Sequence, residues 1–393
     1  MSYSSEMETE AKWAEIDLDA LTYNMKNIRQ KVGEKVKICA VVKANAYGHS
    51  VEDLAEIMKE AGADQFAVSS LDEALELRQY EPDTDILVLG NIPYGTEEIS
   101  VEADLQHAVT SLEKARLLSE AAVKTGRTVR IHIKADTGMT RIGLSPDEEG
   151  ADEAAAIAAL PGVRIEGLFT HFATADERDK TRAVRQHRRF LEFSEKLHER
   201  GIHPEIVHAA NSAAIMEMPE TYHDMVRPGI ILYGIYPSAE CDRDQLDLRP
   251  VMSFKTRIVH VKTLKEEREI SYGGHYTSAP GDQIGTIAAG YADGYTRAQS
   301  GRAEVLFRGK RVKVLGNICM DQCMIDLNGF EDVKIGEEVV LFGRQGDEYI
   351  SADEVGERYH TIGYEVVCAV NRRVPRFFIR QGRVVNKRNY LEK

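Results

Sequence analysis

The chain has 393 residues, of which 43% are hydrophobic and 29% charged, so it is long enough for two domains or for one barrel with an added module. Its formal net charge of -14 opposes binding to a phosphate backbone, and we expect no nucleic-acid partner. The amino terminus is polar, and no apolar run reaches the length of about eighteen residues that crosses a membrane. We therefore expect a cytoplasmic protein without a membrane anchor.

The first half of the chain alternates short apolar runs with longer charged stretches of helical period, which is typical of repeated βα units. The predicted strands are 38–42, 65–68, 85–89, 105–109, 129–134, 165–169, 205–207 and 225–232. Amphipathic stretches such as 51–61, 112–123 and 183–200 predict helices between them. This order favours a closed (β/α)8 TIM barrel over residues 17–247. An open doubly wound sheet is the alternative.

After residue 248 the pattern changes to β-branched runs separated by Gly and Asn. The predicted strands here are 254–262, 284–289, 305–314, 324–327 and 339–342. They indicate a mostly antiparallel β domain over residues 248–385. A lone early strand precedes the barrel pattern, and we expect residues 11–16 to join the β domain.

Polar residues that follow the barrel strands are the first candidates for chemistry, because active sites of such barrels lie at the carboxyl ends of the strands. Lys43 directly follows the apolar run 38–42. A lysine there is partly desolvated, which favours the neutral amine that forms a Schiff base. A solvated lysine at a strand end is the other interpretation, and position alone does not separate the two.

Two further positions allow either a functional or a structural interpretation. Asn211-Ser212 before an apolar helix and Pro228-Gly229 after the last strand offer backbone N–H groups and a hydroxyl for a phosphate, or simply a helix cap and a turn. Tyr272 in the β domain has the pattern of an ordinary hairpin aromatic. No dinucleotide or Walker motif is present.

The five cysteines are odd in number and scattered, which is typical of reduced thiols. Cys319 and Cys323 form the closest pair, but no further ligand follows at zinc-site spacing. We expect ordinary packing at these positions and no metal site.

Six ordered segments together resemble the bacterial alanine racemases, which are pyridoxal phosphate enzymes of fold type III. The segments are 40–49 (AVVKANAYGH), 134–141 (KADTGMTR), 169–173 (FTHFA), 210–214 (ANSAA), 227–230 (RPGI) and 316–321 (GNICMD). The resemblance runs from about Trp13 to Arg376, and the first segment is similar to the cofactor attachment motif of the family.

The resemblance implies an enzyme that interconverts L-alanine and D-alanine and supplies D-alanine for peptidoglycan. Lys43 would hold pyridoxal 5'-phosphate and serve as one acid/base group, and Tyr272 would serve as the other from the opposite face. Racemisation needs two such groups, because the proton leaves one face of the α-carbon and returns to the other.

The resemblance also implies the remaining site residues. The cofactor would be held by Tyr47, His171, Ser212, Arg227, Gly229, Ile230 and Tyr364, with Arg227 at the pyridine nitrogen and His171 near the ring. Arg141 and the Met320 backbone N–H would hold the substrate carboxylate. Lys134 matches a lysine that the family can carbamylate. The family is a homodimer in which Tyr272 and Met320 complete the site of the partner chain.

Three other functions compete with alanine racemisation. A racemase of broader specificity would share the lysine and tyrosine but is usually exported. An amino-acid decarboxylase of the same plan would carry a carboxylate where this sequence has Arg227. A pyridoxal phosphate carrier built from the barrel alone would lack the domain that contains Tyr272, Met320 and Tyr364.

Overall fold

The computed structural model describes residues 3–392, and these divide into two compact units. The barrel unit comprises Thr22–Ala46 and Val51–Leu248. The β unit comprises the described residues before Thr22, the short segment Tyr47–Ser50 and those from Arg249 onward. Met1 and Ser2, which begin the polar amino-terminal stretch, lie outside the described residues, as does Lys393.

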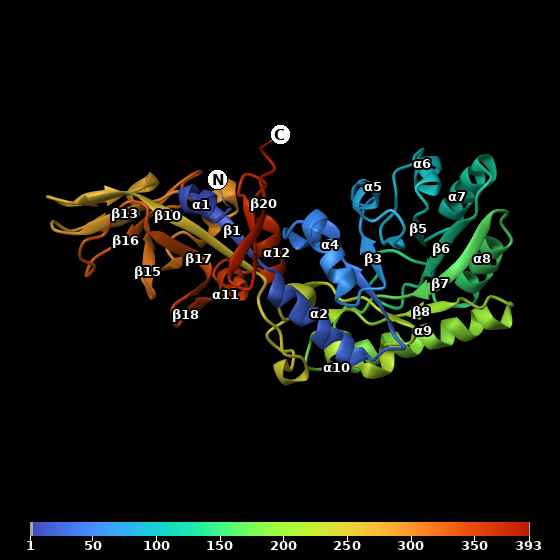
Figure 1. Ribbon diagram of the computed structural model, residues 1–393. Coiled ribbons are helices and arrows are strands. Elements are labelled where there is room, and N and C mark those ends of the chain that lie inside the picture. Colours follow the sequence, from blue (N-terminus) through green and yellow to red (C-terminus); the bar gives the residue numbers. More distant parts are fainter. Residues whose placement is uncertain (1–2, 393) are drawn as a thin grey trace. The chain divides into compact units, whose positions relative to one another are not determined.

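The barrel unit contains eight strands in the order β8-β7-β6-β5-β4-β3-β2-β9, and all its paired neighbours are parallel (Figure 1). The strands are β2 (Lys37–Val41), β3 (Gln65–Val68), β4 (Ile86–Val88), β5 (Gln106–Val109), β6 (Val129–Lys134), β7 (Val163–Phe169), β8 (Ile206–His208) and β9 (Met225–Val226). Hydrogen bonds from Asp224 N to Val207 O (3.1 Å) and from Arg227 N to Ala210 O (2.9 Å) join the two outer strands. The predicted barrel is confirmed, and the open sheet is excluded.

Helices alternate with these strands. They are α2 (Leu18–Val32), α3 (Lys43–Tyr47), α4 (Val51–Glu60), α5 (Leu71–Tyr80), α6 (Glu97–Glu102), α7 (Leu112–Thr125), α8 (Glu148–Ala158), α9 (Thr181–Glu199) and α10 (Ser212–Glu217). Local sequence explains their limits: Ser70 and Glu73 form a capping box at the start of α5, and α7 ends at Gly126, whose φ is 66°. Helix α9 buries one face through Ala183, Phe190 and Leu197, which recur at helical spacing.

The predicted eighth strand, 225–232, is wrong in length. Only Met225–Val226 is extended, and the chain then turns at Pro228 into the 3-10 helix η2 (Ile230–Tyr233). Proline has no N–H to give to a neighbouring strand, although its carbonyl still accepts from Val41 N of β2 at 2.9 Å. The apolar residues Ile230 to Tyr233 are buried within the 3-10 helix, which an apolar run alone does not distinguish from a strand.

The β unit is built on a ten-stranded sheet in the order β18-β17-β14-β15-β16-β13-β10-β1-β19-β20, with β17 also paired to β10 (Figure 1). Its strands are β1 (Lys12–Asp17), β10 (Met252–Thr263), β13 (Gln283–Ile287), β14 (Glu304–Phe307), β15 (Lys310–Leu315), β16 (Cys323–Asp326), β17 (Glu338–Gln345), β18 (Glu348–Ile350), β19 (Arg376–Arg380) and β20 (Arg383–Arg388). Strand β1 pairs antiparallel with β10 and parallel with β19, and the other pairings are antiparallel. The predicted antiparallel character is confirmed.

One predicted strand of this unit, 305–314, is instead a hairpin. Arg308 (φ 48°) and Gly309 (φ 73°) form the turn between β14 and β15. Two consecutive residues with positive φ match the twist of an antiparallel ribbon.

The remaining elements of the β unit are short. They are the hairpin β11 (Arg268–Ile270) and β12 (Tyr276–Ser278), the helices α1 (Tyr3–Thr9), α11 (Ala352–Glu357) and α12 (Gly363–Ala369), and the 3-10 helices η4 (Tyr272–Gly274), η5 (Tyr291–Asp293) and η6 (Arg297–Gln299). The barrel unit has two further 3-10 helices, η1 (Pro219–Thr221) and η3 (Arg243–Gln245). Within residues 3–392, no helix combines the length and apolarity needed to cross a membrane.

Candidate active site

Lys43 stands at the carboxyl end of β2, two residues after its last residue, and is partly exposed. The chain then makes a left-handed turn in which Ala44, Asn45, Ala46 and Tyr47 all have φ between 52° and 54°. Left-handed backbone costs an L-residue about 1–2 kcal/mol each, so this turn is strained and needs other contacts to hold it.

Hydrogen bonds hold the strained turn from the barrel side. Ala44 N donates to Glu73 Oε1 (2.7 Å), and Ala46 N donates to Val42 O (2.8 Å). The Asn45 side chain accepts from Val51 N (2.8 Å), the first residue of α4. The backbone on either side of the Lys43 side chain is therefore fixed at the mouth of the barrel.

His171 lies near four basic side chains of the barrel unit. Burial lowers its pKa well below the ordinary value, and the nearby charges of Arg227, Lys134, Arg141 and Lys43 lower it further. The structure therefore brings five predicted site residues close together from strands β2, β6, β7 and β9 and the segments that follow them. A neutral imidazole near several basic side chains makes the region attractive to an anionic ligand.

Lys134 is the buried member of this group. Burial, followed by the charge of Arg227, lowers its pKa to about 7. Its ammonium lies 5.0 Å from the centre of the Phe169 ring, and Nζ donates to Ala135 O at 3.3 Å. Near neutral pH a substantial fraction of this lysine is an unprotonated amine, unlike an exposed lysine.

Arg227 is 4% exposed and is held by three acceptors. Its guanidinium donates to His208 Nδ1 (2.8 Å), Thr170 O (2.7 Å) and Ala209 O (3.0 Å). None of the described carboxylates forms an ion pair with it, and burial lowers its pKa to about 10. The cation is therefore kept in place by neutral acceptors and retains its charge at neutral pH.

A chain of side chains continues from Arg227 into the barrel. Because a guanidinium only donates, His208 Nδ1 accepts and its proton lies on Nε2, which donates to His132 Nδ1 (2.9 Å). The proton of His132 then lies on Nε2, 3.8 Å from Glu166 Oε2. The pKa of both histidines is lowered by burial, so both are neutral and every donor in the chain points from Arg227 toward Glu166.

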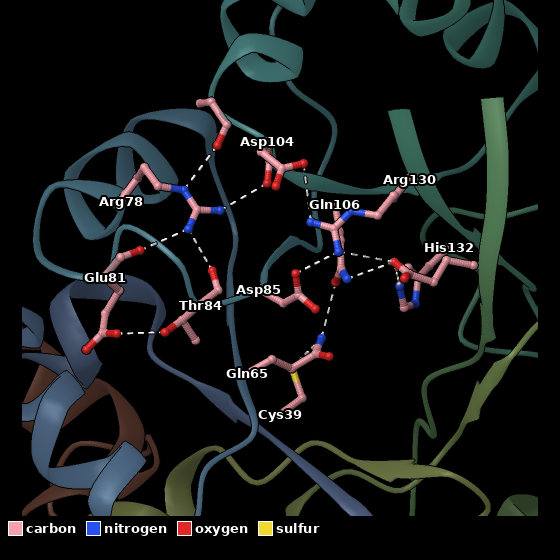
Figure 2. A network of polar contacts seen from close by, with 12 residues as sticks. Cys39, Gln65, Arg78, Glu81, Thr84, Asp85, Asp104, Gln106, Arg130 and His132 are labelled. Atoms are coloured by element: carbon pink, nitrogen blue, oxygen red, sulfur yellow. Dashed lines mark hydrogen bonds and ion pairs between the residues drawn. The ribbon is translucent and has the colours of Figure 1, made fainter. Parts of the chain in front are cut away.

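Glu166 belongs to a polar network with Gln106, Gln65 and Arg130, and these three partners are labelled in Figure 2. Gln106 Nε2 donates to Glu166 (2.8 Å), and Gln65 Nε2 donates to Gln106 Oε1 (3.3 Å). Arg130 pairs with Asp85 at 2.6 Å and lies 3.8 Å from Glu166. The two histidine tautomers are thus fixed from the Arg227 end, whereas the buried His132 Nε2 has no hydrogen-bond partner and only faces Glu166 across 3.8 Å.

The predicted phosphate residues of the barrel unit are adjacent. Gly229 N donates to Ser212 Oγ (2.9 Å), and Ile230 begins the 3-10 helix η2. The cap of α10 is Asn211, whose side chain accepts from Ala214 N (3.1 Å), so capping by Ser212 is wrong. Ser212 does not cap α10, and its Oγ instead accepts from Gly229 N.

The predicted phosphate residues of the β unit also lie together. The rings of Tyr47 and Tyr364 have centroids 6.2 Å apart and are inclined at 55°. Tyr47 is buried and comes from the end of the left-handed turn, whereas Tyr364 is in the first turn of α12.

Tyr272 and Met320 lie on two loops of the β unit that are tied to each other. Asn317 donates its side-chain N–H to Tyr272 O (2.6 Å), and Ser271 Oγ donates to Asn317 O (2.5 Å). Both side chains are unusually exposed for their type, Tyr272 at 67% and Met320 at 51%. Both side chains are therefore accessible on the surface of the β unit.

His132 and Glu166 were not identified from the sequence. A signal for His132 was present, because it lies two residues before Lys134 on β6 and side chains at that spacing share one face of a strand. Glu166 had no such signal, since its meaning depends on contacts with other strands.

Comparison with known proteins identifies the family. The model of the alanine racemase N-terminal domain matches residues 16–237, and that of the alanine racemase C-terminal domain matches residues 251–378. An alanine racemase of Clostridium tetani is 47% identical over 380 residues, which cover 96% of this chain and 98% of the relative. An alanine racemase of Desulforamulus reducens is 47% identical over 367 residues, with 93% and 98% covered.

Solved structures agree with this result. The alanine racemase of Clostridium difficile 630 has a TM-score of 0.94 and 41% identity, with 98% of this chain and 99% of that chain covered. That of Bacillus anthracis with bound L-Ala-P has a TM-score of 0.92 and 41% identity, with 97% and 98% covered. Both domain models and nearly the full length match in one order, and this chain therefore belongs to the alanine racemase family.

Proposed function

We propose that this protein is an alanine racemase that interconverts L-alanine and D-alanine with pyridoxal 5'-phosphate held on Lys43. The observation that carries the proposal is the set of four basic side chains near His171, which includes Lys43 and Arg227, a buried arginine without an ion-pair partner among the described carboxylates. In the decarboxylase alternative the position of Arg227 would hold an acid. Family membership and the two domain matches support the same reaction.

The residues present fit this cofactor, which carries a phosphate, a ring oxygen and a pyridine nitrogen. Arg227 is a buried cation held by neutral acceptors, and the Gly229 N–H and Ser212 hydroxyl lie 2.9 Å apart at the start of a 3-10 helix. We propose that the phosphate is bound by Tyr47, Ser212, Gly229, Ile230 and Tyr364. Arg227 would donate to the pyridine nitrogen, and His171 would pack beside the ring.

We propose that Lys43 and Tyr272 exchange protons with the α-carbon from opposite faces. When bound, the cofactor delocalises the electron pair left on the α-carbon after deprotonation. Arg141 and the Met320 N–H would bind the substrate carboxylate and so hold the α-carbon at a fixed distance from both groups. Tyrosine has an ordinary pKa near about 10, so a nearby cation has to favour its phenolate before it acts as a base.

Lys134 is proposed to carry a carbamate. Its pKa of about 7 leaves the neutral amine that attacks carbon dioxide, which forms the N–C bond while a proton passes to solvent. The product is an anion among Arg227, Arg141 and Lys43, and it would orient Arg141 toward the substrate.

The remaining proposals concern the oligomeric state of the enzyme, its location and the use of its product. We propose a homodimer in which Tyr272 and Met320 complete the partner's site, supported by the exposure of both side chains. A cytoplasmic location is supported by five cysteines that form no disulfide within the described residues. D-alanine for peptidoglycan is the proposed use of the product.

The test measures racemisation and identifies the lysine that carries the cofactor. Purified protein supplied with the cofactor and L-alanine in deuterated water should approach equal amounts of both enantiomers and exchange the α-proton. Borohydride reduction and peptide mapping should place the cofactor on Lys43, and Lys43→Ala should abolish turnover. Failure to racemise alanine, or cofactor found on Lys134, would refute the assignment.

A further inference from the structure

Arg376 is a buried arginine that the proposed chemistry does not use. It lies at the start of β19 with 2% of its surface exposed. Its Nε and Nη2 donate to Gly48 O at 3.3 and 3.1 Å, and Nη2 also donates to Val370 O at 2.6 Å. Its Nη1 donates to Asn371 O at 2.7 Å and to Val374 O at 2.6 Å. All five donors of the guanidinium fork therefore have acceptors.

These acceptors are backbone carbonyls, and no described carboxylate forms an ion pair with Arg376. The guanidinium is desolvated because only 2% of the residue is exposed, and this burial lowers its pKa. A desolvated charge contributes little net stability even when it is hydrogen-bonded. The more informative property of Arg376 is the geometry that its planar fork imposes on two pieces of backbone.

The two pieces of backbone carry the two proposed phosphate tyrosines of the β unit. Gly48 directly follows Tyr47, and Val370 and Asn371 directly follow helix α12, whose second residue is Tyr364. Gly48 has a φ of 82°, and a Cβ at this position would lie 2.4 Å from Val367 O. The close approach of Gly48 to α12 therefore requires glycine at position 48, and the Arg376 guanidinium holds the Gly48 carbonyl in place.

We propose that Arg376 is a positioning residue for the cofactor phosphate. It clamps the Gly48 carbonyl against the end of α12 and thereby holds Tyr47 beside Tyr364, with ring centroids 6.2 Å apart. The proposal rests on the assignment of these tyrosines to the phosphate. It predicts that Arg376 affects the phosphate end of the cofactor selectively.

The test compares two ligands that differ only in the phosphate. Dissociation constants for pyridoxal phosphate and for pyridoxal are measured by absorbance titration of the apoenzyme. Each variant is first shown to be folded and to have the same oligomeric state as the wild type. Arg376→Lys keeps the charge but has three donors on one nitrogen, so it cannot span the same acceptors. We expect about tenfold weaker binding of pyridoxal phosphate, the size of one lost charge-assisted hydrogen bond, and pyridoxal binding within about twofold.

Arg78 in the barrel unit provides a matched control (Figure 2). Its guanidinium also donates only to backbone carbonyls: Ala103 (3.0 Å), Glu81 (2.9 Å), Pro82 (3.1 Å), Thr84 (2.7 Å) and Asp104 (3.0 Å). Its five hydrogen bonds also go to backbone carbonyls, although it is less buried than Arg376, and no proposed ligand residue adjoins its acceptors. Arg78→Lys should lower the melting temperature and leave the ratio of the two dissociation constants unchanged.

A double-mutant cycle checks that the effect passes through the tyrosines. If Arg376 acts by placing Tyr364, then Arg376→Lys in a Tyr364→Phe background should weaken pyridoxal phosphate binding less than about threefold. Gly48→Ala offers an independent route to the same contact, because it leaves Arg376 intact but pushes Gly48 away from Val367. It should reproduce the phosphate-selective loss even if the arginine variant does not fold.

The outcomes distinguish a failure of the role proposed for Arg376 from a failure of the proposed function. Equal weakening of both ligands by the folded variants, or full additivity with Tyr364→Phe, would overturn the positioning role of Arg376. A wild-type protein that does not bind pyridoxal phosphate would instead overturn the proposed function. Phosphate-selective loss in Arg376→Lys, with an unchanged ratio in Arg78→Lys, would support the role, and the same loss in Gly48→Ala would show that the contact held by Arg376 controls the phosphate end.

Discussion

Arg227 is a buried cation whose partners are all neutral. Two neutral histidines continue from it, and their tautomers are fixed because a guanidinium donates and never accepts. Its pKa of about 10 keeps the group charged at neutral pH, so it can donate a hydrogen bond while retaining its proton. If Arg227 faces the pyridine nitrogen as proposed, the ring remains uncharged and is a weaker electron sink, which favours racemisation over side reactions of the carbanion.

Lys134 gives a prediction about stability and pH. Its pKa of about 7 is lower than the ordinary value of 10.5, so between these values the unfolded state binds the extra proton. Stability contributed by Lys134 should therefore rise with pH from about 7 to about 10.5, by up to about 1.4 kcal/mol per pH unit. Urea unfolding of wild type and Lys134→Met in buffer free of carbon dioxide should show wild type gaining on the variant over this range.

Bicarbonate supplies the complementary measurement for Lys134. Added bicarbonate at pH 8 should stabilise wild type and leave Lys134→Met unchanged, because only the lysine forms a carbamate. A difference between the two proteins that stays constant from pH 7 to pH 10 would show that Lys134 is not desolvated.

Among the secondary-structure elements, the turn after Lys43 is the most unusual. Four consecutive residues with left-handed backbone are rare, and none of the four is glycine. The contacts of Glu73 and Asn45 compensate for the strain on the barrel side. Strain of this kind is often found where a reactive group has to be held in one orientation, which agrees with the role proposed for Lys43.

The strain predicts an unusual response to glycine. Ala44 is exposed and left-handed (φ 52°, ψ 45°), so Ala44→Gly should leave the free energy of unfolding unchanged or raise it by up to about 1 kcal/mol. The same change at the exposed Ala156 in α8 should lower it by about 0.5–1 kcal/mol, because that residue is in a right-handed helix. Urea unfolding of both variants tests the sign, and an equal loss at both positions would contradict the assigned strain.

At the level of the whole molecule, several large side chains of the β unit are exposed. Tyr272, Met320, Tyr291 and Ile362 are all at least 40% exposed. Exposed large apolar and aromatic side chains are enriched at protein interfaces. Their exposure is consistent with the proposed dimer, in which Tyr272 and Met320 serve the partner's site.

Complementation between inactive chains tests that dimer. Lys43→Ala and Tyr272→Phe chains should each be inactive alone, but a mixed dimer would contain one site with both defects and one intact site. About half of the wild-type activity per mixed dimer should return, because a twofold interface repeats each contact. Absence of recovery, despite mixing demonstrated by differential tags, would mean that both residues act within one chain.

The sequence by itself determined the order of elements and the chemistry available at their ends. Apolar periodicity is a local property, so the barrel strands and the change to antiparallel structure after residue 248 were predictable from neighbouring residues. The same locality explains the errors: the run 225–232 looks like a strand although Pro228 ends it, and 305–314 looks continuous although Arg308 and Gly309 turn it.

Only the tertiary structure decided which side chains meet and in which protonation state. Lys134 has a pKa of about 7 because other strands bury it beside Arg227, and the histidine tautomers follow from contacts between β6, β8 and the end of β9. Arg376 contacts Gly48 across 328 positions of sequence, and no sequence pattern near either residue predicts that contact. Burial and hydrogen bonding between distant segments depend on how the chain packs, and no local pattern encodes them.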